Sequence, residues 1–279
     1  MILSLNGIIA GRGAVTPLLL DTYSGSIAAY SLRKLRATYT GYAIRVRRSS
    51  DNTSLDIGFD ANGNLDTTTM LSFVGANNGF VSIWYDQSGN GYNLSQSSSS
   101  NQFRIVYAGN LDMLNSKVSV VANYNFANVA FASASFGTSY NQTTIMHVGS
   151  HTNSVEKWLW STLNGVNPNR MECYQESNNL LSLYAGANMQ LSYTPSISTQ
   201  RLIYAKYNST NSLLAINNGA GSTGNSGGGS MAGVYLNTVV GSTFYTPASY
   251  IQEFLIFQGN QDSNRTGISS NINSHYTIY

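Results

Sequence analysis

Hydrophobic and polar residues alternate with a period of two along most of this chain, in short runs that end at Gly, Asn, Ser or Asp. That period is typical of β-strands with one buried and one exposed face. The strands predicted in this way span residues 43–48, 81–85, 119–122, 144–148, 181–184, 202–207, 212–216, 232–236 and 253–257. The pattern therefore predicts an all-β protein.

Two segments break this period and predict short helices. Residues 27–35 space their apolar side chains as a helix does. A second helix is expected after Asp262 or Ser263, either of which can cap its first turn. Apolar residues recur there every four positions, at Ile268, Ile272 and Tyr276.

Glycine and asparagine mark the connections between the strands. Asn62-Gly63 and Asn218-Gly219 predict tight turns. Residues 221–230 consist only of Gly, Ser, Thr and Asn, which predicts a long mobile loop. No Gly-Lys-Ser or Gly-Lys-Thr ends this loop, so it is not a phosphate-binding P-loop.

No change of composition divides the 279 residues, and only four are Pro. We therefore expect a single lectin-like β-sandwich domain over residues 17–279, since all-β domains of this size are common. Residues 1–16 form an N-terminal arm, expected to stay mobile or to order against a neighbouring subunit. Asn6 and Arg12 interrupt its apolar character, so a signal peptide is not expected. No run of 18 apolar residues predicts a membrane span.

Charged residues make up only 9% of the chain, against about 25% in an ordinary soluble domain. The formal net charge is +2, so a nucleic-acid partner is not expected. The only tight basic cluster contains Arg45, Arg47 and Arg48. Because Arg45 and Arg47 share one face of a predicted strand, a half-exposed strand explains the cluster better than a phosphate or acidic-glycan site does.

Metal and cofactor chemistry has little support in the sequence. Cys173 is the only cysteine, which excludes an internal disulfide and a thiolate zinc site. His147 and His151 are four residues apart in a predicted strand and its turn, where that spacing does not bring a metal pair together. We therefore expect no metal and no cofactor.

Two segments resemble the opening of calcium loops. They begin at Asp60 and Asp86, each followed by Asn or Ser residues at alternate positions. Ser97 stands where the second loop would need its bidentate Glu, and the first also lacks one. Capping of turns by the two Asp side chains is the preferred interpretation of both.

Residues 84–94, Trp-Tyr-Asp-Gln-Ser-Gly-Asn-Gly-Tyr-Asn-Leu, follow the basic strand at 43–51 and the segment 29–33, Ala-Tyr-Ser-Leu-Arg. Together they resemble the N-terminal half of the catalytic domain of the fungal-type α-L-arabinofuranosidase B family. The resemblance implies a concanavalin-A-like jelly-roll β-sandwich and a glycosidase scaffold. The last strand and helix are similar to those of many laminin-G-like domains.

The acidic residues that this family uses have no clear counterparts here. Retaining glycosidases need a pair of carboxyl groups. The family's Asp-Met-Glu-Asn nucleophile motif corresponds to Asn188-Met189-Gln190-Leu191, in which both acids are amides. The region expected to hold the acid/base, residues 240–245, has no carboxylate, and the family's adjacent Cys pair is missing. These departures predict that the chain is not an enzyme, because amides cannot serve as nucleophile or acid.

A sugar ligand would suit an aromatic platform beside amides and carboxylates. The candidate ligand-binding residues are Trp84, Tyr85, Asp86, Asn90, Asn188 and Gln190. For Trp84 and Asp86 a structural role is favoured over ligand binding: Trp84 would be buried in the core, and Asp86 would cap a turn.

Three function classes remain after this reading. The first is a non-catalytic bacteriophage virion protein of the capsid, spike or tail, since the joined segments resemble structural proteins of phages. It would be a homo-oligomer in the virion, with other virion proteins and cell-surface glycans as partners. The second class is a free carbohydrate-binding module, and the third is an active α-L-arabinofuranosidase. The sequence favours the first class.

Overall fold

The computed structural model describes residues 17–122, 132–152, 157–163, 170–176, 178–239 and 248–279. Within these residues, nineteen antiparallel strands form one continuous sheet that folds over into two layers. Each strand predicted from the sequence overlaps a strand of the structure, so the all-β prediction is confirmed. The arm predicted at residues 1–16 lies outside the described residues.

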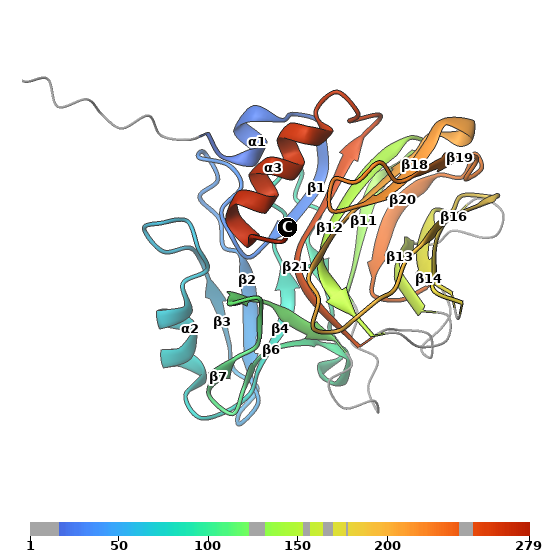
Figure 1. Cartoon of the computed structure of the whole chain (residues 1–279). Helices are drawn as coiled ribbons and strands as arrows, with labels where there is room; N and C mark the ends of the chain where they lie inside the picture. Colours follow the sequence, from blue (N-terminus) through green and yellow to red (C-terminus); the bar gives the residue numbers. More distant parts are fainter. Residues whose placement is uncertain (1–16, 123–131, 153–156, 164–169, 177, 240–247) are drawn as a thin grey trace, which may run out of the picture.

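The first layer is built around β21 (Ser249–Gln258). One edge of β21 pairs with β12 (Thr143–His151), and the other with β1 (Ser26–Ser31) and β10 (Val120–Ala122). Beyond β12 the layer continues through β17 (Arg201–Tyr207), β18 (Ser212–Ile216) and β19 (Ser222–Gly224). Figure 1 shows β21 crossing the middle of the molecule.

In the described part of the chain, the second layer contains ten strands. In spatial order these are β16 (Asn188–Ser192), β15 (Leu180–Tyr184), β14 (Glu172–Gln175), β13 (Lys157–Thr162), β20 (Met231–Leu236), β11 (Ala132–Tyr140), β5 (Leu94–Ser95), β4 (Gly79–Trp84), β2 (Ile44–Arg48) and β3 (Ser54–Ile57). β6 (Phe103–Tyr107) pairs with both β4 and β10 and so joins the layers. The short strands β7 (Asn110–Leu111), β8 (Met113–Leu114) and β9 (Lys117–Val118) lie beside this junction.

The main core lies between the two layers. Trp160 of β13 packs against Phe254 of β21, with ring centroids 5.6 Å apart, and against His147 of β12 at 6.0 Å. Because side chains alternate along a strand, Met146 and Val148 of β12 point to the opposite side. They belong to a second cluster beneath the helices, so β12 is buried on both faces.

Two helices cover this outer face of the first layer. They are α1 (Leu19–Thr22) and α3 (Arg265–Tyr276), which lie beside each other in Figure 1. Ile268, Ile272 and Tyr276 of α3 are buried in the second cluster, so the predicted C-terminal helix is confirmed. The helix α2 (Thr67–Val74) was not predicted, although Asp66 caps it by accepting a hydrogen bond from the Thr69 N–H at 3.0 Å. Two single turns of 3₁₀ helix are η1 (Ser99–Asn101) and η2 (Ser209–Asn211).

Two predictions of local structure were wrong. Residues 27–35 are not helical, because Ser26–Ser31 forms β1 and pairs with β21. β1 is buried on both faces, so its continuous apolar run mimics a helix. The segment 221–230 is not a mobile loop throughout, since it contains β19 and the buried Ser226, whose hydroxyl contacts that of Ser212 at 2.7 Å.

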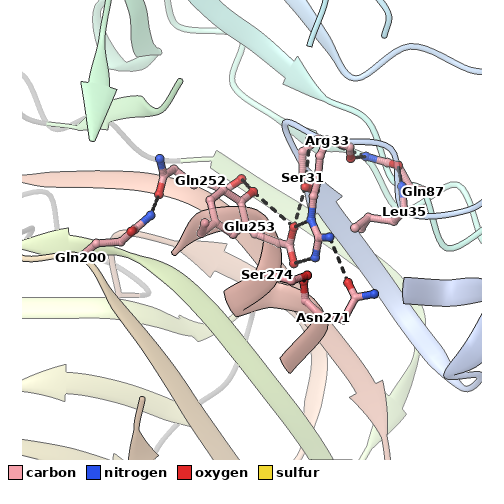
Figure 2. A network of polar contacts seen from close by, with 10 residues as sticks. Ser31, Arg33, Leu35, Gln87, Gln200, Gln252, Glu253, Asn271 and Ser274 are labelled. Atoms are coloured by element: carbon pink, nitrogen blue, oxygen red, sulfur yellow. Dashed lines mark hydrogen bonds and ion pairs between the residues drawn. The ribbon is translucent and has the colours of Figure 1, made fainter. Parts of the chain in front are cut away.

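A buried ion pair joins β1, β21 and α3, as Figure 2 shows. Arg33 follows β1 and donates hydrogen bonds to both carboxylate oxygens of Glu253, at 2.8 and 3.1 Å. The Ser31 hydroxyl donates to the same carboxylate at 2.7 Å, and Asn271 of α3 accepts from Arg33 at 2.9 Å. Gln87 donates to the Arg33 carbonyl at 3.0 Å. The side chain of Glu253 is fully buried, so its charge depends on these partners.

We expect Glu253→Gln to lower the free energy of unfolding by about 3–5 kcal/mol, because it leaves the Arg33 charge buried without a counter-charge. Chemical denaturation followed by circular dichroism measures the loss. Asp51→Asn is the matched control: it removes the exposed Arg48–Asp51 pair, at 2.6 Å, which solvent screens. Equal losses for the two variants would contradict this account of the buried pair.

The buried histidines predict a loss of stability in acid. Burial lowers the pKa of His147 to about 3 and that of His151 to about 4, against 6.5. Between those values and pH 6.5 the unfolded chain binds protons that the folded chain does not, so the folded state is destabilised as the pH falls. Each histidine contributes about 1.4 kcal/mol per pH unit in that window.

Urea denaturation at a series of pH values from 7 to 5 checks this slope. The variant His147→Gln removes one of the titrating groups and is expected to flatten the pH dependence. A variant with the wild-type slope would show that His147 does not contribute.

Candidate functional site

The register of the second layer places one row of side chains on its outer side. Residues directly opposite each other in antiparallel strands point to the same face. From β16 to β3 these partners are Asn188, Tyr184, Glu172, Ser161, Tyr235, Ser133, Ser95, Ile83, Arg45 and Asp56. We call this set the polar row. The opposite face carries core residues such as Trp160, Leu236 and Trp84.

A β-bulge in β13 positions the centre of the polar row. Trp158 is paired with Tyr174, but Trp160 is paired with Cys173, so the register shifts by one residue between them. Trp160 therefore faces the core, while Trp158 stacks on the outward-facing Tyr174 with ring centroids 5.2 Å apart. After the bulge, Ser161 stands opposite Glu172.

Glu172 is the buried acid of the polar row, with only 1% of the residue exposed. Burial raises the pKa of its carboxyl group above the ordinary value. The nearby Trp158 indole and the positive charge of Arg170 oppose this shift without cancelling it. The Arg170 Nε lies 2.9 Å from a Glu172 carboxylate oxygen. A raised pKa favours the protonated form of the carboxyl group, which is the form that a general acid needs.

Glu176 lies four residues further along the chain on the same side. Partial burial raises its pKa, but hydrogen bonds from Ser182, Gln190 and Asn188 outweigh that effect and lower the pKa. Gln190 donates at 2.7 Å and Asn188 at 3.2 Å. Two acids on one face, with pKa values shifted in opposite directions, form an arrangement suited to acid–base chemistry. About 3.3 Å of rise per residue puts their Cα atoms roughly 13 Å apart.

Three of the candidate residues, Trp84, Asp86 and Asn90, hold the fold together. Trp84 is fully buried in the core. Asp86 accepts hydrogen bonds from the backbone N–H groups of Ala29 and Ser88, both at 2.8 Å, which is the predicted capping role. The Asn90 amide donates to the Ile27 carbonyl at 2.8 Å. These contacts tie the segment after β4 to β1.

The remaining candidates lie elsewhere. The Tyr85 hydroxyl donates to Asp56 at 2.6 Å, beside β3. Asn188 and Gln190 belong to β16, at the other end of the second layer, and both bind Glu176. The structure therefore divides the six candidate residues into separate groups. Whether any of them contacts a ligand stays a prediction.

The turn that begins at Asp60 is capped as predicted. One Asp60 carboxylate oxygen accepts from the Asn62 and Asn64 N–H groups, both at 2.8 Å. In the described part of the chain, no cluster of three or more His, Cys, Asp or Glu side chains could hold a metal ion. Cys173 is a buried free thiol. None of the helices in the same residues is long and apolar enough to cross a bilayer.

The structure is thus a β-sandwich that carries, on one outer face, two acids with pKa values shifted in opposite directions. The family model for the catalytic domain of α-L-arabinofuranosidase B matches residues 21–182, and the chain belongs to this family. The matched region contains the segments 29–33, 43–51 and 84–94 that carried the resemblance in the sequence.

The chain is also similar to individual members of this family. A probable α-L-arabinofuranosidase B of Aspergillus flavus is 30% identical over 178 residues, covering 62% of this chain and 35% of that protein. The structure of an arabinofuranosidase soaked with a cyclic sulfate inhibitor superposes with a TM-score of 0.66 at 17% identity, covering 88% of this chain and 62% of that one. The structure of an arabinofuranosidase complexed with arabinofuranosyl-α-1,2-xylobiose gives 0.63, with the same identity and coverage.

These likenesses confirm the predicted fold class, a concanavalin-A-like jelly-roll β-sandwich with short helices. The chain spans about a third of the length of the curated relatives that it matches. The division into an arm at 1–16 and one domain at 17–279 stays a prediction, as do self-association and glycan binding.

The comparisons overturn the favoured function. The chain was predicted to be a non-catalytic phage virion protein located in the virion, but its matched relatives are arabinofuranosidases. The prediction that it is not an enzyme is wrong on the same finding. It rested on the amides Asn188 and Gln190, yet these side chains bind Glu176, and the buried Glu172 lies two strands away.

Sequence reasoning did not identify Glu172 as a site residue. Its only local signal is a Glu between the apolar residues Met171 and Cys173. In a strand, that setting predicts an acid on the face opposite a buried cysteine.

We expect the pKa of Glu172 to lie above 4.5 and that of Glu176 below it. The variant Arg170→Gln is expected to raise the pKa of Glu172 further, because it removes the positive charge that favours the ionised form. Carbon-13 NMR titration of the glutamate side chains measures both values. A Glu172 pKa that falls in Arg170→Gln would contradict the assigned electrostatics.

Proposed function

We propose that this chain is an arabinofuranosidase-like glycoside hydrolase that cleaves α-L-arabinofuranosides. One observation carries the proposal: in a chain of the arabinofuranosidase B family, the outer face of the second layer holds a buried glutamic acid whose pKa is raised. This matches the demand of glycoside hydrolysis for a carboxyl group that is still protonated when the substrate binds.

Glu172 is assigned the role of general acid. Its proton passes to the glycosidic oxygen as the bond to the anomeric carbon breaks, so the leaving sugar departs as a neutral alcohol. Water then supplies hydroxide to the anomeric carbon, and its remaining proton returns to the Glu172 carboxylate. Arg170, at 2.9 Å, limits the rise in the pKa of Glu172 and holds its carboxyl group in place.

Glu176 is the ionised partner on the same face. Its lowered pKa keeps it negatively charged, so it adds to the negative potential of the face that Glu172 shares. Three neutral side chains, those of Ser182, Asn188 and Gln190, hydrogen-bond it and fix its position. The amides that replace acids in the family's motif therefore orient a carboxylate.

The substrate class follows from the relatives. One solved relative is complexed with arabinofuranosyl-α-1,2-xylobiose, an arabinose unit on a short chain of neutral sugars. The stacked pair Trp158 and Tyr174 supports such a ligand, because aromatic rings beside hydroxyl and amide groups suit sugar rings.

The wild-type chain is expected to release 4-nitrophenol from 4-nitrophenyl α-L-arabinofuranoside. On an arabinoside of a poorly acidic alcohol, we expect Glu172→Gln to lower kcat by about 10²–10⁴-fold, because the amide has no acidic proton to donate. 4-Nitrophenol leaves with little protonation, so kcat for the 4-nitrophenyl substrate should fall less.

Asp21→Asn, which changes an acid on the surface helix α1, is the matched control and should keep wild-type turnover. Circular dichroism establishes that each variant is folded. Absence of turnover by the wild type between pH 4 and 7, or full turnover of the arabinoside of a poorly acidic alcohol by Glu172→Gln, would overturn the proposal.

A further inference from the structure

Beyond Tyr235, the polar row runs into a hollow of about 510 Å³ on the outer side of the second layer. Hydroxyl groups dominate its walls: among the lining residues are Ser54, Ser82, Ser95, Ser97, Ser133 and Tyr235. The hollow therefore extends from β20 across β11, β5 and β4 to β3.

The register connects this hollow to Glu172. Ser161 lies opposite Glu172, Tyr235 opposite Ser161, Ser133 opposite Tyr235, and Ser95 opposite Ser133. At about 4.8 Å for each step between strands, Ser95 lies roughly 19 Å from Glu172 along the curved face. That span is too long for one pentose ring and suits a chain of several linked sugars.

The positively charged side chains beside the hollow already bind partners within the protein. Arg45 donates two hydrogen bonds to the Asp56 carboxylate, at 2.8 and 2.7 Å. Arg47 donates to the side-chain oxygens of Gln102 at 2.7 Å and Asn52 at 2.8 Å. An anionic ligand would have to compete with these partners, so the walls are better suited to a neutral ligand.

The chemistry of the walls matches a polyol. Serine hydroxyls and glutamine amides both donate and accept hydrogen bonds, as sugar hydroxyls require. Ile83 and the ring of Tyr235 add apolar surface against which a sugar ring can lie.

We propose that the hollow is a second glycan-binding subsite, which holds the neutral sugar chain that carries the arabinosyl unit cleaved at Glu172. The inference rests on the proposed function, because that function places the arabinosyl end of the sugar chain at Glu172. Binding in the hollow does not itself require cleavage, so the two can fail separately.

The first experiment compares substrates of different length. The variants Ser95→Phe and Ser97→Phe place a large ring in the hollow, and both serines are exposed, so the fold should tolerate the change. The ratio of kcat/KM for a long arabinose-substituted xylo-oligosaccharide to that for 4-nitrophenyl α-L-arabinofuranoside should fall about fivefold in each, as for the loss of one or two hydrogen bonds.

The control is Ser270→Phe, an equal change at an exposed position of α3, which covers the first layer on the other side of the molecule. It should leave the ratio unaltered. Thermal melts of all three variants establish that they are folded.

The second experiment measures binding without turnover. Calorimetric titration with an unsubstituted xylo-oligosaccharide should show affinity that Ser95→Phe weakens about fivefold and Ser270→Phe preserves. If this holds while no arabinoside is cleaved, the proposed function fails and the subsite stands. If the arabinoside is cleaved but Ser95→Phe and Ser270→Phe behave alike in both experiments, the subsite is overturned. Tighter binding of an acidic galacturonate oligomer than of the neutral chain would also overturn it.

Discussion

The contact between Trp160 and Phe254 holds the two layers of this protein together. It joins β13 of the second layer to β21, the central strand of the first, at a ring separation of 5.6 Å. Burial of two large aromatic side chains is among the strongest contributions that single residues make to a core. Because Trp160 must face inward, Ser161 and its partner Glu172 must face outward. The position of the candidate acid thus follows from core packing.

The strands could be predicted from the sequence because their apolar runs are short and end at turn residues, even where both faces are buried, as in β12. The prediction failed in two places. β1 is buried on both sides, between the main core and the cluster beneath α3, and its apolar run imitated a helix. β19 was missed because Gly, Ser and Thr give no alternation, although the strand pairs with β18. In both cases the sheet neighbour decided the conformation, and a local pattern does not show that neighbour.

The candidate site was harder to predict than the fold. Trp84, Asp86 and Asn90 form a conspicuous motif in the sequence, but most of their contacts are with β1 and the core. Glu172 has no such motif around it. Its setting depends on the bulge in β13, on Arg170 and on the pairing of β13 with β20, which comes more than 70 residues later in the chain. The same holds for Asn188 and Gln190, which were interpreted as lost acids before their contacts with Glu176 were known.

The bulge in β13 makes the length of that strand a stricter requirement than its composition. Side-chain direction in a strand repeats every two residues. One residue added or removed between positions 157 and 161 would therefore turn the outward-facing side chains toward the core and the core-facing ones toward solvent. Ser161 would then enter the core, and an aromatic ring would stand in solvent opposite Glu172. Evolutionary change of the sequence in this segment should therefore occur by substitution, and insertions and deletions should be confined to the connecting loops.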